Sequence, residues 1–170
     1  DPRTSYSIAK RFNEIYLKSL WFERGIVSSS IRYFNVYGPR QDTRMVIPRF
    51  IDQALKCEPI TVYGDGNQTR DFTFVSDVVN AIVTAAESDL SGEMINIGSN
   101  NTYSINRLVE LLGGDITYIP KRPGEPDCTW ADISKANQLL NWRPKVSLEA
   151  GVEILLDNME HWIVSQAPYQ

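Results

Sequence analysis

The sequence has little of the chemistry that marks disulfide-rich, zinc-binding or nucleic-acid-binding proteins. Its 170 residues include two cysteines and one histidine, and Cys57 and Cys128 do not form a close pair. We therefore expect neither a disulfide framework nor a metal site, and we expect a reducing, cytoplasmic location. The formal net charge of −4 argues against a nucleic-acid partner. No apolar run is long enough to span a membrane, and we expect no signal peptide.

What the sequence does contain is typical of a globular α/β protein. Hydrophobic residues make up 42% and charged residues 22% of the chain, as in ordinary globular domains. Apolar spacing predicts helices over residues 7–24, 48–55, 76–86, 104–112, 134–140 and 148–163. Apolar, β-branched runs predict strands over 26–34, 60–63, 71–75, 93–97 and 116–119. The alternation indicates an α/β fold with a mainly parallel sheet.

Local signals mark the ends of several of these elements. Gly25 is expected to end the first helix. Ser76–Asp77 and Ser104 are expected to cap two later helices. Pro48 suits the first turn of the second helix.

Tyr6 and Lys10 are the first candidate catalytic residues. Four residues apart on a helix, they share one face. A nearby ammonium lowers the pKa of a phenol, and such a tyrosine can take a proton from a sugar hydroxyl while a hydride leaves the same carbon. On its own, the pattern also fits two residues of an ordinary amphipathic helix.

Three further segments combine aromatic, basic and acidic residues at predicted strand ends and turns. Residues 32–39 lie at the carboxyl end of a predicted strand, where open α/β sheets bind ligands. Arg70 and Arg122 are able to clamp a diphosphate. Glu125 can accept hydrogen bonds from ribose hydroxyls, and Tyr63 can lie flat on a pyrimidine. The alternatives are a surface ion pair of Arg70 with Asp71, a core position for Tyr63, and solvated loop charges at Arg122 and Glu125.

Taken together and in order, these segments resemble the extended short-chain dehydrogenase/reductase family, and more narrowly an NAD-dependent nucleotide-sugar epimerase of the UDP-glucose 4-epimerase type. The resemblance extends from Ser5 to about Trp162. Its most specific strings are RYFNVYGP at 32–39, YGDG at 63–66 with TRDF at 69–72, RPGE at 122–125, ADISKA at 131–136 and LNWRP at 140–144.

The resemblance implies a role for each matching residue. Tyr6 would be the catalytic acid and base, and Lys10 would hold the nicotinamide ribose and tune Tyr6. Tyr33 would lie against the nicotinamide of NAD. The implied substrate contacts are Asn35 and the pair Arg70 and Arg122 at the diphosphate, Met45 and Val46 in a loop around the nucleotide, Tyr63 at the uracil, Glu125 at the ribose, and Thr129 at the C2 substituent of the sugar.

The implied reaction inverts C4 of a UDP-sugar, or of another NDP-sugar, through a transient 4-keto sugar and enzyme-bound NAD. Sugar 4,6-dehydratases and UDP-glucuronate decarboxylases share the first oxidation step and remain open alternatives. A non-catalytic nucleotide-sugar-binding fragment is another. The family also implies a homodimer, with neither nucleic acid nor membrane as partner.

The chain departs from the family in what it lacks. It contains no G-x-x-G-x-x-G loop and no residue far enough upstream of Tyr6 to be the family's catalytic serine or threonine. We therefore expect the second half of such an enzyme, inactive when isolated. Residues 1–36 and 71–99 would belong to a doubly wound, Rossmann-like NAD-binding domain. Residues 37–70 and 100–170 would form a smaller α/β domain that binds the nucleotide sugar.

Overall fold

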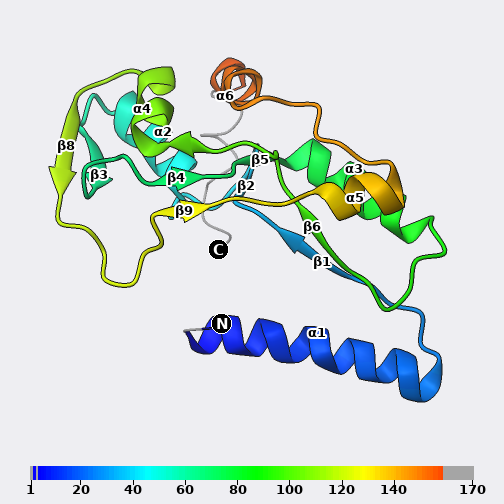
Figure 1. Ribbon diagram of the computed structural model, residues 1–170. Coiled ribbons are helices and arrows are strands. Elements are labelled where there is room, and N and C mark those ends of the chain that lie inside the picture. Colours follow the sequence, from blue (N-terminus) through cyan, green and yellow to red (C-terminus); the bar gives the residue numbers. More distant parts are fainter. Residues whose placement is uncertain (1, 3, 159–170) are drawn as a thin grey trace, which may run out of the picture.

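The protein is described from a computed structural model, which places residue 2 and residues 4–158 (Figure 1). Its helices are α1 (Ser5–Arg24), α2 (Val46–Leu55), α3 (Val75–Ala86), α4 (Ile105–Leu112), α5 (Ser134–Leu140) and α6 (Leu148–Asp157). Its strands are β1 (Ser30–Tyr33), β2 (Val36–Tyr37), β3 (Ile60–Tyr63), β4 (Thr69–Arg70), β5 (Thr73–Phe74), β6 (Met94–Ile97), β7 (Tyr103–Ser104), β8 (Ile116–Ile119) and β9 (Cys128–Thr129). Residues 159–163 of the last predicted helix lie outside the described residues.

The strand pairs confirm the expected α/β class with mainly parallel pairing. β1 pairs with β6, β2 with β5, and β3 with β8, each in parallel. β4 lies between β7, which is antiparallel to it, and β9, which is parallel. Because neighbouring parallel strands end at the same edge of a sheet, the polar residues that follow β1 and β6 are brought toward each other.

The β1–β6 pair lies between α1 on one side and α3 with α5 on the other (Figure 1). The α3 side forms a buried cluster around Val78, Ala81, Ile95, Ile97, Ala131, Ile133, Ala136, Leu140 and Trp142. In contrast, α1 buries none of its residues. Its half-buried residues include Leu17, Leu20 and Trp21.

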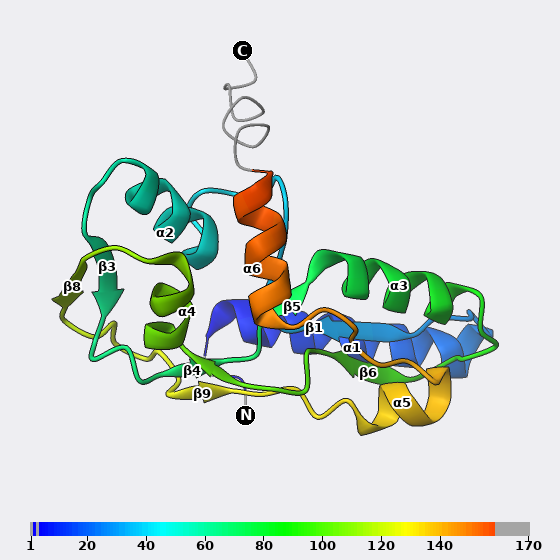
Figure 2. The same cartoon turned by 90° about the horizontal axis from the view of Figure 1, so that it is seen from above.

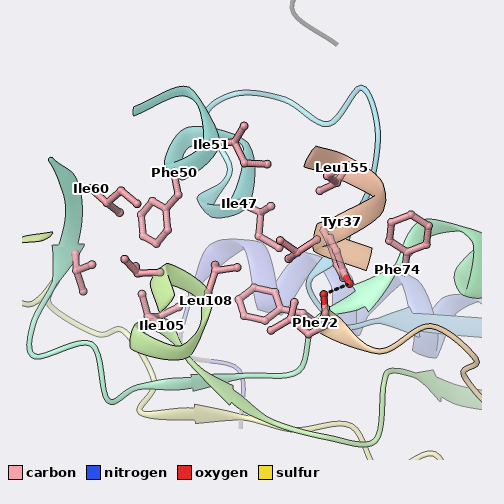
Figure 3. Close-up of a cluster of buried hydrophobic side chains, with 14 residues drawn as sticks. Tyr37, Ile47, Phe50, Ile51, Ile60, Phe72, Phe74, Ile105, Leu108 and Leu155 are labelled. Carbon is pink, nitrogen blue, oxygen red and sulfur yellow. Dashed lines mark hydrogen bonds between the residues drawn. The ribbon is translucent and has the colours of Figure 1, made fainter. Parts of the chain in front are cut away.

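A larger hydrophobic cluster joins α2, α4 and α6 with β3 at the other end of the molecule (Figures 2 and 3). Tyr37 lies in this cluster, and its hydroxyl donates to the carbonyl oxygen of Ser147 over 3.3 Å. Gly151 on α6 allows the close approach, because a Cβ there would lie 2.0 Å from the Tyr37 hydroxyl oxygen. Burial raises the pKa of the Tyr37 phenol, so it remains a neutral donor.

Two sequence predictions need correction at element boundaries. The strand predicted over 26–34 is confirmed only as Ser30–Tyr33, because its partner β6 begins at Met94 and Val27 is 73% exposed. The strand predicted over 71–75 is confirmed only as β5 at Thr73–Phe74, and α3 already begins at Val75.

The predicted cap at Ser76–Asp77 is also wrong. Phe74 is the N-cap residue of α3, and no side chain caps the helix there. Instead, the buried carboxylate of Asp77 accepts hydrogen bonds from the backbone amides of Lys145 and Val146, each over 2.9 Å. In contrast, Gly25 in the left-handed conformation and the Ser104 side chain cap α1 and α4 as predicted.

The division into 1–36 with 71–99 and 37–70 with 100–170 stays a prediction. Residues 131–142 of the second unit pack on α3 and β6 of the first, through Ala131, Ile133 and Trp142. Among the described helices, none is long and apolar enough to cross a membrane.

Candidate functional site

The first turns of α1 present Tyr6 and Lys10 on one face, as their spacing predicts. Thr4 caps this helix, because its side chain accepts from the Ser7 amide while Ser7 accepts from the Thr4 amide. The Lys10 ammonium lies 5.6 Å from the centre of the Tyr6 ring, within the range of a cation–π contact. The Tyr6 side chain points into open space, with 72% of the residue exposed.

The same face of α1 continues to Glu14, which ties the helix to the sheet. Arg32 on β1 donates from Nε and Nη2 to the two carboxylate oxygens of Glu14 over 2.5 and 2.6 Å. α1 and β1 run in opposite directions (Figure 1). Eight residues of helix from Glu14 back to Tyr6 span about 12 Å. Three residues of strand from Arg32 on to Asn35 span about 10 Å. Tyr6 is thus about level with Asn35.

Asn35 follows β1 in a strained conformation, with φ of 30°. Asparagine tolerates this left-handed region better than most residues. Its side-chain amide donates to the Asp71 carbonyl oxygen over 3.0 Å and to the Thr129 hydroxyl over 3.2 Å. The structure thus brings together two predicted site residues, Asn35 and Thr129, that are far apart in sequence. Tyr33, which precedes Asn35 at the end of β1, is 50% exposed.

The carboxylate of Asp71 organises the backbone around Asn35. Asp71 is fully buried, and it accepts from the Ser99 amide over 2.6 Å and the Ala131 amide over 3.1 Å. Gly98 is needed here, since a Cβ at that position would lie 2.8 Å from an Asp71 carboxylate oxygen. The alternative of a surface ion pair between Arg70 and Asp71 is therefore wrong.

The carboxylate partner of Arg70 is instead Glu125. Nη2 of Arg70 lies 2.7 Å from Oε1 of Glu125, and the two side chains are 10% and 27% exposed. Their backbones are connected through β9, whose Thr129 pairs with Arg70 on β4. The arginine and the acid that the sequence assigns to one nucleotide site are therefore neighbours.

A cavity of about 90 Å³ opens beside this pair. It is lined by Arg44, Val46, Arg49, Phe50, Tyr63, Gln68, Ile105, Arg122 and Glu125. The Arg122 guanidinium carbon lies 3.9 Å from the centre of the Tyr63 ring, so the two side chains stack. Hydrogen bonding and charge from Arg122 lower the pKa of the Tyr63 phenol. Tyr63 is only half-buried and, contrary to the core alternative, presents its ring to this cavity.

Several lining residues were missed by sequence reasoning. Arg49 lies one helical turn after Met45, and the helical period of this segment is the signal that would place it beside Val46. Gln68 donates from its amide to the Tyr63 carbonyl oxygen over 2.7 Å and closes the turn between them. Met45 lies in the segment before α2 as its N-cap, whereas the expected loop position of Val46 is wrong, because Val46 is the first residue of α2.

The predicted site residues thus form three groups. Tyr63, Arg122, Glu125 and Val46 line the cavity, and Arg70 is paired with Glu125. Asn35 and Thr129 form a second, hydrogen-bonded pair. Tyr6 and Lys10 form a third on α1, and in the described part of the chain no side-chain hydrogen bond, ion pair or ring contact joins them to Tyr33 or Asn35.

The side chains of Lys10 and Tyr33 fit one side of a nicotinamide cofactor. Lys10 makes no ion pair with any described residue, and Tyr33 offers a half-exposed ring at the end of β1. Both could contact a nicotinamide and its ribose. Residues 2 and 4–158 contain no group of acidic, histidine or cysteine side chains suited to a metal.

Comparison with known families and proteins gives a consistent result. The model of the NAD dependent epimerase/dehydratase family matches residues 1–98. An uncharacterized UDP-glucose epimerase of Bacillus subtilis is 39% identical over 89% of this chain and 50% of its own length. A UDP-glucuronate 4-epimerase of Thermodesulfobacterium geofontis is 37% identical over 89% of this chain and 49% of its own length.

A UDP-glucuronic acid decarboxylase of Xenopus tropicalis is also similar, with 36% identity over 89% of this chain and 38% of its own length. Among solved structures, UDP-glucuronic acid 4-epimerase of Bacillus cereus, in complex with UDP-glucuronic acid and NAD, aligns with a TM-score of 0.89 and 38% identity over 95% of this chain and 54% of that one. The chain thus spans about half the length of the first curated relatives it matches.

Proposed function

The chain belongs to the NAD dependent epimerase/dehydratase family, and we propose that it forms the sugar-nucleotide side of a UDP-sugar 4-epimerase that uses NAD. The observation that carries this proposal is the convergence of the Tyr63 ring, the Arg122 guanidinium and Glu125, the partner of Arg70, at one cavity. These groups match the base, the diphosphate and the ribose hydroxyls of a nucleoside diphosphate.

In this proposal the cavity residues hold the nucleotide firmly. Tyr63 stacks on the uracil, Arg70 and Arg122 bind the diphosphate, and Glu125 accepts from the ribose. Since Arg122 covers the Tyr63 ring in the structure, it must leave the ring when a base takes its place. Its guanidinium is then able to pair with a phosphate. Met45 and Val46 border the nucleotide from the start of α2.

Asn35, Tyr6 and Lys10 act at the sugar end. Asn35 donates to the diphosphate once its side-chain amide leaves Asp71 or Thr129. Tyr6 takes the proton of the C4 hydroxyl and later returns it. Lys10, whose ammonium lies 5.6 Å from the centre of the Tyr6 ring, holds the nicotinamide ribose, while Tyr33 lies against the nicotinamide. When bound, NAD would accept the hydride from C4 and return it to the opposite face. Firm holding of the nucleotide and few fixed charges at the sugar allow the 4-keto sugar to turn.

Thr129 is proposed to set the size of the sugar pocket. In the family, the position four residues after the ribose-binding acid limits the C2 substituent when it holds a tyrosine. Thr129 leaves that volume free, and its hydroxyl already accepts from Asn35. An acetamido group at C2 is therefore admitted.

A decarboxylase acting on UDP-glucuronic acid is the second candidate function, and the similarity to the Xenopus tropicalis enzyme favours it. Both candidates, like a sugar 4,6-dehydratase, begin with oxidation at C4. A third alternative, a non-catalytic fragment that binds a nucleotide sugar, needs the cavity but no catalytic residues.

We further propose a cytoplasmic homodimer that buries the exposed aromatic residues Phe12 and Tyr16 of α1.

Isothermal titration of the chain with UDP-glucose and with NAD tests the proposal. We expect saturable binding of UDP-glucose and poor binding of NAD, because the sequence contains no G-x-x-G-x-x-G loop to hold the pyrophosphate. For the same reason, we expect no epimerisation by the chain alone. Absence of UDP-glucose binding at millimolar concentration would overturn the proposed site.

Addition of a polypeptide that carries the glycine-rich loop then separates the two reactions. With UDP-glucuronic acid as substrate, an epimerase yields the C4 epimer and a decarboxylase releases carbon dioxide. Formation of the epimer without carbon dioxide supports the first candidate, and the reverse supports the second.

A further inference from the structure

Three arginines line the cavity beside Tyr63, namely Arg44, Arg49 and Arg122, and a fourth, Arg70, is paired with the lining residue Glu125. The four differ in whether a carboxylate neutralises them. Arg44 pairs with Asp42 over 2.5 Å, and Arg70 pairs with Glu125 over 2.7 Å. Within residues 2 and 4–158, Arg49 and Arg122 have no carboxylate at ion-pair distance. The cavity therefore carries two uncompensated positive charges next to one aromatic ring.

The Arg49 side chain is held at the cavity by contacts within the protein, but one of its hydrogen-bond donors has no acceptor in the described chain. Its Nη2 donates to the Thr61 carbonyl oxygen over 3.2 Å, and its guanidinium carbon lies 5.6 Å from the centre of the Tyr63 ring. Its Nε is buried and finds no hydrogen-bond acceptor in the described chain. Buried donors without a partner are uncommon in folded proteins. A ligand oxygen is an acceptor that would satisfy this one.

We propose that Arg49 is a further ligand-binding residue of this site and that, together with Arg122, it neutralises the diphosphate of a nucleoside diphosphate. Arg70 brings its own counter-ion, Glu125, so it contributes donors but little net charge. Each phosphate of a UDP-sugar carries a negative charge, and the two free guanidinium groups match them. This inference rests on the proposed function and adds a residue to its substrate site.

Calorimetric titration of the chain with UDP and with uridine tests the role of Arg49. Arg49→Ala should weaken the binding of UDP by about tenfold to a hundredfold, the effect of losing a hydrogen bond to a charged group. It should change the binding of uridine, which has no phosphate, by less than about threefold. Arg49→Lys keeps the charge and should recover part of the UDP affinity. Arg107→Ala is the matched control, because Arg107 lies outside the cavity lining and is paired with Glu110 and Glu149.

Thermal melting of each variant shows whether it is folded, and Arg49→Gln replaces Arg49→Ala if loss of the Thr61 contact unfolds the chain. If the wild-type chain binds UDP and the uncharged variants Arg49→Ala and Arg49→Gln bind it equally well, the inference about Arg49 is wrong while the proposed site stands. An equal loss for UDP and uridine also contradicts it, because Arg49 would then act on the nucleoside. If the wild-type chain does not bind UDP, the proposed function itself fails.

Discussion

Arg32 on β1 holds both carboxylate oxygens of Glu14 on α1, with N–O distances of 2.5 and 2.6 Å. α1 buries none of its residues fully, and this two-point contact fixes the helix to the sheet at Glu14. Tyr6, Lys10 and Glu14 follow one another at four-residue intervals on one helical face. The orientation of Glu14 therefore also sets the side to which Tyr6 and Lys10 point.

We predict that the contribution of Glu14 to stability depends on pH. Hydrogen bonds from Arg32 lower the pKa of Glu14 below its ordinary value of 4.5. A lowered folded-state pKa gives a stabilisation that is present above that ordinary value and is lost as the pH falls through the folded-state value. Glu14→Gln should therefore lower the melting temperature at pH 7 and have progressively less effect in acid. Glu110→Gln, at an exposed pair with Arg107, is the control. A difference that does not change with pH would contradict the prediction.

Arg122→Ala should raise the pKa of the Tyr63 phenol. The guanidinium of Arg122 lies 3.9 Å from the ring centre and favours the ionised phenol. Alkaline titration of tyrosinate absorbance measures this pKa, and Tyr63→Phe identifies the signal that belongs to Tyr63. An unchanged titration in Arg122→Ala would mean that the stack does not persist in solution.

Asp71→Asn should strongly destabilise the fold. The Asp71 carboxylate accepts from the Ser99 and Ala131 amides, and an asparagine side chain cannot present two acceptor oxygens to them. We expect a loss of about 1.5–3 kcal/mol for each charged hydrogen bond removed, measured by urea unfolding. Asp89→Asn at an exposed position is the control and should have little effect. Equal unfolding midpoints for the two variants would refute this role of Asp71.

Arg70→Ala and Arg122→Ala should each weaken binding of a UDP-sugar by about 2–5 kcal/mol, provided that the charge pair is desolvated. Since Arg70 and Glu125 contact each other over 2.7 Å, the effects of Arg70→Ala and Glu125→Ala should not add. A double-mutant cycle by calorimetry measures this coupling. Additive losses would show that the two residues act independently on the ligand. An unchanged UDP affinity in Arg122→Ala would remove Arg122 from the clamp.

Thr129→Tyr should disfavour UDP-N-acetylglucosamine relative to UDP-glucose, because a phenol ring would occupy the volume proposed for the acetamido group. The ratio of the two affinities, measured on the wild-type chain and the variant, tests this. Thr129→Val keeps the volume but removes the acceptor for Asn35, so it separates size from hydrogen bonding. A ratio that Thr129→Tyr leaves unchanged would show that another residue limits the pocket.

Features that depend on short stretches of chain could be predicted from the sequence. The helical spacing of Tyr6 and Lys10, the left-handed Gly25 that ends α1 and the Ser104 cap of α4 are all confirmed. Each depends on backbone geometry over a few residues, which local sequence controls. The α/β class is confirmed for the same reason, because alternating helical and strand periods are visible in the sequence.

Long-range partners were decided by the tertiary structure. The sequence placed Asp71 beside Arg70 and gave Asp77 a capping role, but the fold buries both acids and turns them to backbone amides of distant segments. Arg70 pairs with Glu125, 55 positions away. Arg49 reaches Tyr63 only because α2 packs beside β3. A buried carboxylate takes whichever donors the packing brings within hydrogen-bond distance, and neighbouring residues in the sequence do not specify that packing.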